Sequence, residues 1–179
     1  RAMTNRLSLG ITAKYLRESL WDFSASTIAF DVGTAYDLGY KGLRLAMSAQ
    51  NFGGAVEYLE EGDREAGYDL PLVFRIGVAV DVLGANGLVD MNPMHRMVLS
   101  AEAINTNDFS ERLHIGTEYW FSDFLALRAG YRMNYDEGNW SLGFGLAPSF
   151  AGMDVRLDYA YVAYEFLDAP HRYTLTIGF

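Results

Sequence analysis

The sequence predicts an all-β protein, an antiparallel transmembrane β-barrel with about ten strands in this chain. Hydrophobic and polar residues alternate with a period of two along most of its 179 residues. Neighbouring side chains of a strand point to opposite faces, so each alternating segment has one apolar and one polar face. Most segments contain eight to eleven residues, and the clearest apolar faces carry no formal charge. A tilted strand needs about 9–11 residues to cross a bilayer, whereas a typical soluble strand has about 5–6.

The segment Leu72–Val82 illustrates the pattern. Phe74 and Ile76 fall on one face, and Arg75 and Asp81 fall on the other. The strands that we expect are Arg6–Tyr15, Leu43–Asn51, Leu72–Val82, Arg112–Phe121, Leu125–Tyr135, Met153–Ala163 and Arg172–Phe179 and, with weaker alternation, Ile28–Asp37, Arg96–Ile104 and Trp140–Ala147.

The segments between these strands alternate in length, and the whole chain is expected to form one domain, residues 1–179. Bacterial barrels have short inner turns and longer external loops. We expect inner turns at Gly39–Gly42, Gly84–Met94, Ser122–Asp123 and Ser149–Gly152, and external loops at Arg17–Thr27, Phe52–Pro71, Asn105–Ser110, Asp136–Asn139 and Tyr164–Pro170. Within the longest loop, Ala55–Arg64 is a candidate for a short helical turn.

Composition disfavours several classes of function. The 14 Lys and Arg residues against 23 Asp and Glu give a net charge of −9, which opposes binding to a nucleic-acid backbone. The absence of Cys excludes disulfides, thiolate zinc sites, iron–sulfur clusters and Cys nucleophiles. No Ser elbow, HExxH helix or glycine-rich phosphate loop occurs. We therefore expect neither catalysis, nor a cofactor, nor a metal site.

A soluble antiparallel sandwich would show the same alternation, with the apolar faces packed in a core. The barrel is favoured because aromatic residues cluster at the strand ends, where the interfaces of a bilayer hold Tyr and Trp. The residues that form this predicted girdle are Tyr15, Tyr36, Phe52, Phe74, Phe121, Tyr135, Trp140 and Tyr173. The last seven residues also place Tyr173, Leu175, Ile177 and a terminal Phe179 in alternation, which resembles the signal read by the outer-membrane assembly machinery.

Charges of both signs lie on the predicted polar face. Such residues can pair across neighbouring strands and fill a narrow lumen, or they can line a path for ions or substrate. Mixed signs favour the first interpretation, because a selective pore usually carries a ring of one sign. The charge network that we expect in the lumen comprises Arg44, Arg75, Asp81, Glu102, Arg112, Glu118, Arg128, Arg156 and Asp158.

Several runs together resemble the PorV/PorQ family of outer-membrane proteins. They are GITAKY from Gly10, STIAFDVGT from Ser26, GLRLAMSAQNFG from Gly42, PLVFRIGVA from Pro71, EYWF from Glu118, LRAGYR from Leu127, LDYAY from Leu157 and HRY from His171. The resemblance implies a FadL-like barrel of about fourteen strands in the bacterial outer membrane. We therefore expect this chain to be the carboxyl-terminal portion of a longer barrel, with a closed ten-stranded barrel as the alternative.

PorV-like proteins are similar to components of the type IX secretion system, which recognise secreted cargo and dock on a translocon. The resemblance thus implies a non-catalytic protein that contacts lipid and binds the translocon, the cargo or a surface complex through external loops. The candidate partner-binding residues are Trp21, Phe23, Phe52, Glu57, Tyr58, Leu59, Glu60 and Glu61. Two alternatives stay open: a FadL-like channel for hydrophobic small molecules, and a structural membrane subunit of a larger assembly. For the acidic loop residues, simple solvation is a further interpretation.

Overall fold

The computed structural model describes residues 5–20, 23–58, 66–150, 152–166 and 168–178, and every regular element among them is a β-strand. The strands are β1 (Leu7–Leu20), β2 (Phe23–Asp37), β3 (Arg44–Gly53), β4 (Val56–Tyr58), β5 (Ala66–Tyr68), β6 (Val73–Leu83), β7 (His95–Thr106), β8 (Arg112–Phe121), β9 (Leu125–Met133), β10 (Trp140–Leu146), β11 (Ser149–Phe150), β12 (Met153–Val162) and β13 (His171–Gly178). Within these described ranges, no helix is long and apolar enough to cross a membrane.

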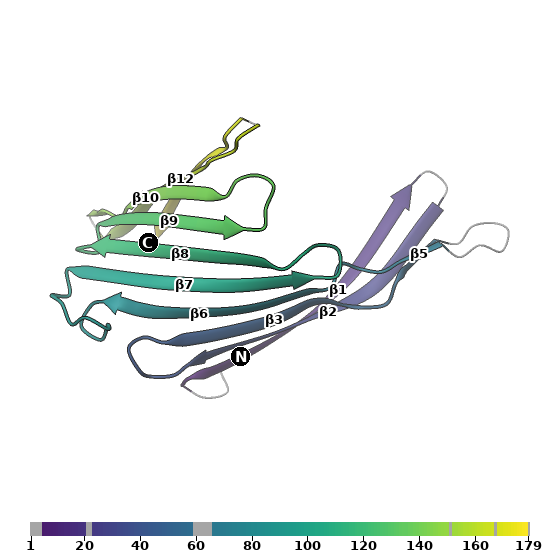
Figure 1. Cartoon of the computed structure of the whole chain (residues 1–179), viewed down its shortest axis with the longest axis horizontal. Coiled ribbons are helices and arrows are strands. Elements are labelled where there is room, and N and C mark those ends of the chain that lie inside the picture. Colours follow the sequence, from purple (N-terminus) through teal and green to yellow (C-terminus); the bar gives the residue numbers. More distant parts are fainter. Residues whose placement is uncertain (1–4, 21–22, 59–65, 151, 167, 179) are drawn as a thin grey trace. The chain divides into compact units, whose positions relative to one another are not determined.

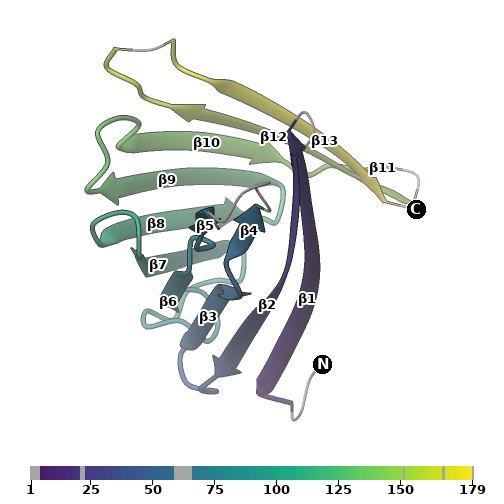
Figure 2. The same cartoon turned by 90° about the vertical axis from the view of Figure 1, so that its right-hand side faces the viewer.

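Eleven strands form one antiparallel sheet in the order β1-β2-β3-β6-β7-β8-β9-β10-β12-β11, with β13 paired to β12. Strands β4 and β5 form a separate two-stranded sheet. Nearly every strand pairs with its neighbour in sequence, as Figures 1 and 2 show for β7 to β10. Over the described residues, this order begins at β1 and ends at β11 and β13 without closing.

All ten predicted strands are confirmed, each with ends that differ by a few residues at most, except at the β1–β2 hairpin. The period of two located them because each strand has a different environment on its two faces. Strand β9 stops at Met133, before the predicted end at Tyr135, because Asn134 takes a left-handed conformation with φ of 62°.

The prediction of a loop at Arg17–Thr27 is wrong. Strand β1 continues to Leu20 and β2 begins at Phe23, and the ladder pairs Arg17 with Ser26. The expected loop was the segment between two alternating strands, but a ladder requires only backbone groups and not alternation. Once the neighbouring rows of the hairpin are paired, each further pair toward the turn costs little additional loop-closure entropy.

The predicted helical turn at Ala55–Arg64 is also wrong over its described part. Val56–Tyr58 is strand β4, which pairs with Ala66–Tyr68, and residues 59–65 lie outside the described residues. Ser149–Gly152, predicted as a turn, includes the two residues of β11 paired with Met153 and Asp154. In both places pairing with a nearby segment overrides the local propensity.

The chain divides into two compact units. Unit 1 comprises Arg1–Tyr36, Ala46–Ile76 and Ile104–Glu111, and unit 2 comprises Asp37–Leu45, Gly77–Ala103 and Arg112–Phe179. Strands β3, β6 and β7 each contribute residues to both units, and every interaction described below lies within one unit.

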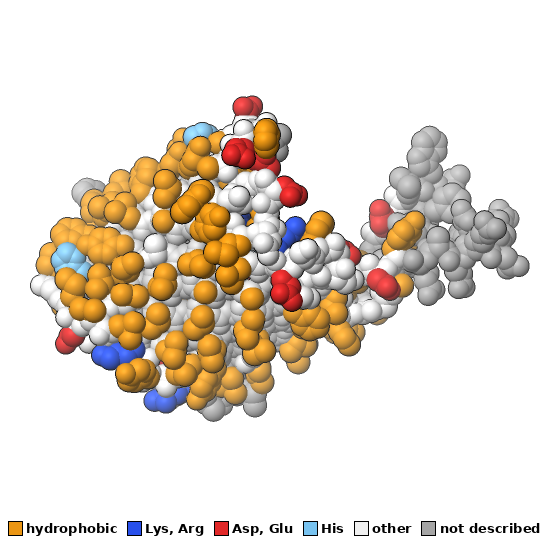
Figure 3. All heavy atoms as spheres, viewed as in Figure 1, with side chains coloured by type: hydrophobic (Ala, Val, Ile, Leu, Met, Phe, Trp, Pro, Cys, Tyr) orange, Lys and Arg blue, Asp and Glu red, His pale blue; other side chains and the backbone are white. Residues whose placement is uncertain are grey.

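The apolar faces of the strands are largely exposed. Only Ala25, Ala29, Ile104, Trp120 and Ala126 are buried hydrophobic residues among those described, and none is a fully buried large side chain. Figure 3 shows many hydrophobic side chains on the surface in view. The exposed set includes Ile11, Ile28, Val32, Met47, Ile76, Ile115, Leu127, Leu142, Leu157 and Leu175.

Candidate functional site

The main polar cluster of unit 2 is a chain of alternating charges. Arg128 on β9 lies directly opposite Glu118 on β8, and its Nε donates to Glu118 Oε2 at 2.5 Å. Its Nη1 donates to Asp158 Oδ1 on β12 at 2.8 Å. Arg156 Nε then donates to Asp158 Oδ2 at 2.7 Å. The Arg128 side chain is only 26% exposed, so these bonds are partly shielded from solvent.

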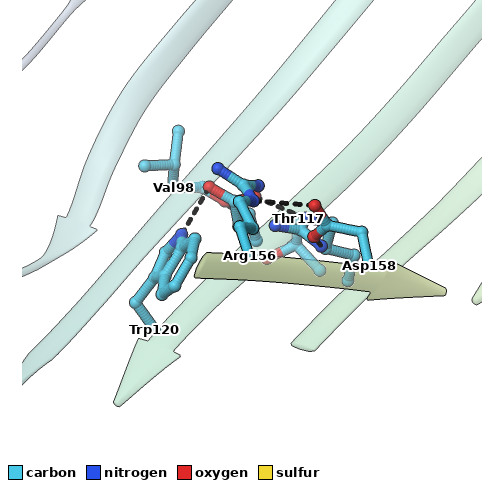
Figure 4. Close-up of polar contacts among 7 residues, drawn as sticks. Val98, Thr117, Trp120, Arg156 and Asp158 are labelled. Atoms are coloured by element: carbon cyan, nitrogen blue, oxygen red, sulfur yellow. Dashed lines mark hydrogen bonds and ion pairs between the residues drawn. The ribbon is translucent and has the colours of Figure 1, made fainter. Parts of the chain in front are cut away.

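Trp120 lies at one end of this cluster, with its indole directed toward the charged groups (Figure 4). Its indole Nε1 donates to Glu118 Oε1 at 2.7 Å, and the residue is only 7% exposed. The guanidinium carbons of Arg96, Arg128 and Arg156 lie 5.7, 5.6 and 5.3 Å from the ring centroid. Each distance is within the range for a cation–π interaction. The indole therefore contacts three guanidinium groups, from β7, β9 and β12, and one carboxylate from β8.

The close-up also shows how β7 is attached to β8 beside this cluster. Thr117 Oγ1 donates to the carbonyl oxygen of Val98 at 3.2 Å (Figure 4). At the adjoining turn, Arg96 and Asp123 form an exposed ion pair of 3.2 Å. Such an exposed pair adds little stability by itself.

Glycine on β10 lets Arg128 reach past one strand to Asp158. Strand β10 lies between β9 and β12, and Gly145 is directly opposite Asp158. A Cβ atom at Gly145 would lie 2.5 Å from Asp158 Oδ1 and 3.0 Å from Arg128 Nη1. The bridge therefore depends on the missing side chain.

We expect Gly145→Val to break the Arg128–Asp158 bridge and to destabilise the protein by about 1–3 kcal/mol, through overpacking and loss of a charged hydrogen bond. Chemical denaturation measures this difference. Gly10→Val is the control, because a Cβ at Gly10 meets no atom within 4 Å. Equal destabilisation by both substitutions would refute the role of Gly145.

A separate ion pair joins β3 to β6. Arg44 Nη2 lies 2.7 Å from Asp81 Oδ1, and Arg44 Nε donates to the carbonyl oxygen of Gly42 at 3.1 Å. Gly42 has φ of 62°, and an added Cβ would collide with Asp81. Glycine is therefore required at this turn for both its conformation and its size.

A third cluster surrounds Tyr135. His114 Nε2 lies 2.8 Å from the Tyr135 hydroxyl, and His114 Nδ1 lies 3.4 Å from Glu102 Oε2. The guanidinium carbons of Arg112 and Arg132 lie 4.4 and 4.9 Å from the centroid of the Tyr135 ring. Arg132 also donates to the carbonyl oxygen of Gly138, which fixes the β9–β10 turn.

The nine charged residues predicted for one network thus occupy several places. Glu118, Arg128, Arg156 and Asp158 form the Trp120 cluster, Arg44 pairs with Asp81, and Glu102 and Arg112 belong to the Tyr135 cluster. Arg75 lies on the part of β6 that belongs to unit 1. A concavity of about 600 Å³ in unit 2 is lined by residues that include Arg44, Ser100, Gly116, Glu118, Arg128 and Asp158.

Unit 1 contains a polar cluster at the root of the predicted Phe52–Pro71 loop. Lys14 Nζ lies 2.6 Å from Asp31 Oδ2 and donates to Asn51 Oδ1 at 3.1 Å. The Asn51 backbone N–H donates to Asp31 Oδ1 at 2.9 Å, and Asn51 Nδ2 donates to the carbonyl oxygen of Pro71 at 2.9 Å. Three strands and the far end of the loop therefore meet at one asparagine.

The predicted partner-binding residues are only partly described. Phe52 lies in β3 and is 65% exposed, Phe23 begins β2, and Glu57 and Tyr58 lie in β4. The predictions for Trp21, Leu59, Glu60 and Glu61 fall outside the described residues.

Sequence reasoning missed three residues of these clusters. Trp120 and Asn51 are not among the predicted site residues, and Tyr135 was predicted only for the aromatic girdle. Trp120 lies two residues after Glu118 on the same face, which is a usable signal. The role of Asn51 depends on pairing between distant strands and leaves no local signal.

Among the described residues, no group of three or more His, Asp or Glu side chains is placed to hold a metal ion. Neither a protein-family model nor a curated protein matches the chain. Three features of the structure therefore bear on function. One face of the sheet is apolar and exposed, the other carries paired charges, and the Asn51 cluster holds both ends of the long segment Phe52–Pro71, called the excursion below.

Proposed function

We propose that the chain forms part of the wall of a non-catalytic β-barrel in the bacterial outer membrane, and that this barrel binds protein partners through its external loops. The observation that carries the proposal is the contrast between the two faces of one sheet. Large hydrophobic side chains lie exposed on one face, while Glu118, Arg128 and Asp158 pair on the other. Lipid against the first face and a polar lumen against the second account for both.

Strand length and aromatic placement in unit 2 support a bilayer around this sheet. The ten residues of β8 extend about 30 Å, or roughly 23 Å after a tilt of about 40°, close to the apolar band of known barrels. The rings of Tyr131 and Trp140 are in tilted contact, with centroids 4.5 Å apart, at one end of the strands. His95 and Phe121 lie 5.4 Å apart at the opposite strand ends. Aromatic rings at both levels fit two interfaces.

The long strands of unit 1 support docking outside the bilayer. Strands β1 and β2 have 14 and 15 residues, whereas crossing a bilayer takes about 9–11. The surplus rows pair Arg17 with Ser26 and Glu18 with Ala25, so they are more polar than the rows below. These outer pairs of β1 and β2, and the excursion after Phe52, would lie outside the bilayer in water, where a protein can bind them.

The resemblance to PorV-like proteins suggests the class of partner, namely a secretion translocon, its cargo or a surface complex. Exposed aromatic residues such as Phe52 are suitable anchors for such a partner. The acidic residues of the excursion would favour a partner with a basic surface.

A photoreactive amino acid at Phe52 tests this proposal in cells. We expect it to cross-link one outer-membrane or secreted protein reproducibly, because Phe52 is exposed beside the excursion. The control position is Tyr40, which is 66% exposed in the turn before β3. Mass spectrometry identifies the adducts; equal adducts from both positions, or none from Phe52, would contradict docking at this surface.

A FadL-like channel for hydrophobic molecules is the second candidate, and the concavity of about 600 Å³ on the polar side favours it. Uptake of a hydrophobic fluorophore into vesicles that contain the protein separates the two candidates. Uptake without a cross-linked protein supports the channel. If neither uptake nor a cross-linked protein is observed, the remaining candidate is a structural membrane subunit.

A further inference from the structure

The excursion from Phe52 to Pro71 leaves strand β3 through an unusual residue. Asn51 has φ of 60° inside β3, in the left-handed region that most side chains avoid. Asparagine tolerates this conformation better than most residues. A left-handed residue within a strand redirects the chain, as in a β-bulge. Asn51 therefore sets the direction in which the chain leaves β3. We call this point the first root of the excursion, and its return at Pro71 the second root.

Side chains from two other strands hold that conformation. The Asn51 N–H donates to the Asp31 carboxylate on β2 at 2.9 Å. Lys14 bridges Asp31 and the Asn51 side chain, at 2.6 and 3.1 Å. Lys14 sits opposite Ala29 in the ladder, so Asp31 is its diagonal neighbour, within reach of a long side chain.

The same asparagine also holds the second root. Its Nδ2 donates to the carbonyl oxygen of Pro71, where the chain returns to the sheet. One side chain therefore ties the residue before the excursion to the residue at its end.

Two close contacts reinforce the first root. A Cβ at Gly53 would lie 2.3 Å from the carbonyl oxygen of Ile28 and 3.0 Å from the Cα of Ala29, so only glycine fits this approach without backbone movement. Thr27 Oγ1 donates to the carbonyl oxygen of Gly54 at 3.1 Å. The excursion therefore starts from a fixed base.

We infer that Lys14, Asp31 and Asn51 are positioning residues that hold both roots of the excursion and thereby set where Phe52 and strands β4 and β5 are presented to a partner. This inference rests on the proposed docking function. A loop with fixed roots loses less conformational entropy when a partner binds, which raises affinity. The three residues need not touch the partner.

Asn51→Gly is the decisive variant. Glycine keeps the left-handed backbone but removes both side-chain hydrogen bonds. Ser48→Gly is the matched control, because it adds similar backbone freedom in β3 and Ser48 takes part in none of the bonds of the cluster. Asn51→Asp is a second variant that keeps an acceptor for Lys14 and replaces the donor to Pro71 with a carboxylate oxygen.

The chain has no cysteine, so spin labels attached at Ser26→Cys and Tyr68→Cys are unique. Pulsed electron resonance in lipid vesicles then measures the distance between β2 and the end of the excursion. We expect a narrow distribution in the parent and in Ser48→Gly, a broad one in Asn51→Gly, and an intermediate one in Asn51→Asp. The yield of partner cross-linking at Phe52 should fall about tenfold in Asn51→Gly, the effect of losing two ordinary hydrogen bonds.

An unchanged distance distribution in Asn51→Gly would overturn the inference. A broad distribution with an undiminished cross-link yield would overturn it as well, because docking would then not need fixed roots. If the parent itself forms no cross-link, the docking function fails, and the distance measurement still decides whether these residues fix the roots.

Discussion

Replacing Leu127 by Arg is expected to destabilise the folded protein in a bilayer by about 2–4 kcal/mol, the cost of a cation on the lipid face near the midplane of a barrel. Leu127 lies in the middle of β9, is 49% exposed, and is flanked by Tyr119 and Phe144 on the neighbouring strands. Denaturant titration of the protein folded in lipid vesicles measures the change.

Leu88→Arg provides the control for this substitution. Leu88 is 56% exposed in the connection between β6 and β7, outside the strands. A surface substitution away from packed features usually changes stability by less than about 0.5 kcal/mol. If Leu127→Arg were as mild as Leu88→Arg, the apolar face would have to lie in water, and the membrane proposal would fail.

The second large effect is expected from Arg128→Ala. This change leaves Glu118 and Asp158 without their shared cation, and it removes one of three guanidinium groups around Trp120. Removal of one partner of a buried ion pair costs about 3–5 kcal/mol, and partial exposure of these groups reduces the expectation to about 2 kcal/mol. Equilibrium unfolding of the same vesicle preparation gives the value.

Arg44→Ala is the matched control, since it removes one arginine whose side chain is 50% exposed in a single ion pair with Asp81. Such pairs contribute about 0–1 kcal/mol. A double-mutant cycle between Arg128→Ala and Asp158→Ala should give a coupling of about 1 kcal/mol. No coupling, or equal costs for Arg128→Ala and Arg44→Ala, would show that the Trp120 cluster is not cooperative.

The strands of this fold could be predicted because each of them carries a simple local signal. In β6, Phe74, Ile76 and Val78 are more exposed than Arg75 and Gly77, which the period of two anticipates. Polar ladders lack that signal. The outer rows of β1 and β2 were therefore missed, since Arg17 and Ser26 pair through their backbones. The partners of a strand likewise depend on contacts that periodicity does not encode.

The candidate clusters were predictable in composition but not in connectivity. The sequence placed Glu118 and Arg128 in one network of mixed charges but named no pairs. The link from Arg128 to Asp158 crosses a strand, and it exists because Gly145 leaves space. Asn51 draws its role from residues 37 and 20 positions away, Lys14 and Asp31. These are properties of the assembled sheet.

The claim that one face of the sheet meets lipid can be measured directly along β9. Single cysteines placed in turn from Leu125 to Met133 can be spin-labelled in vesicles, and their accessibility to oxygen and to a water-soluble nickel complex can be compared. We predict alternation with a period of two: labels at Leu127, Ala129 and Tyr131 favour oxygen, and labels at Arg128 and Gly130 do not. Equal access of the nickel complex to both faces would contradict the membrane account.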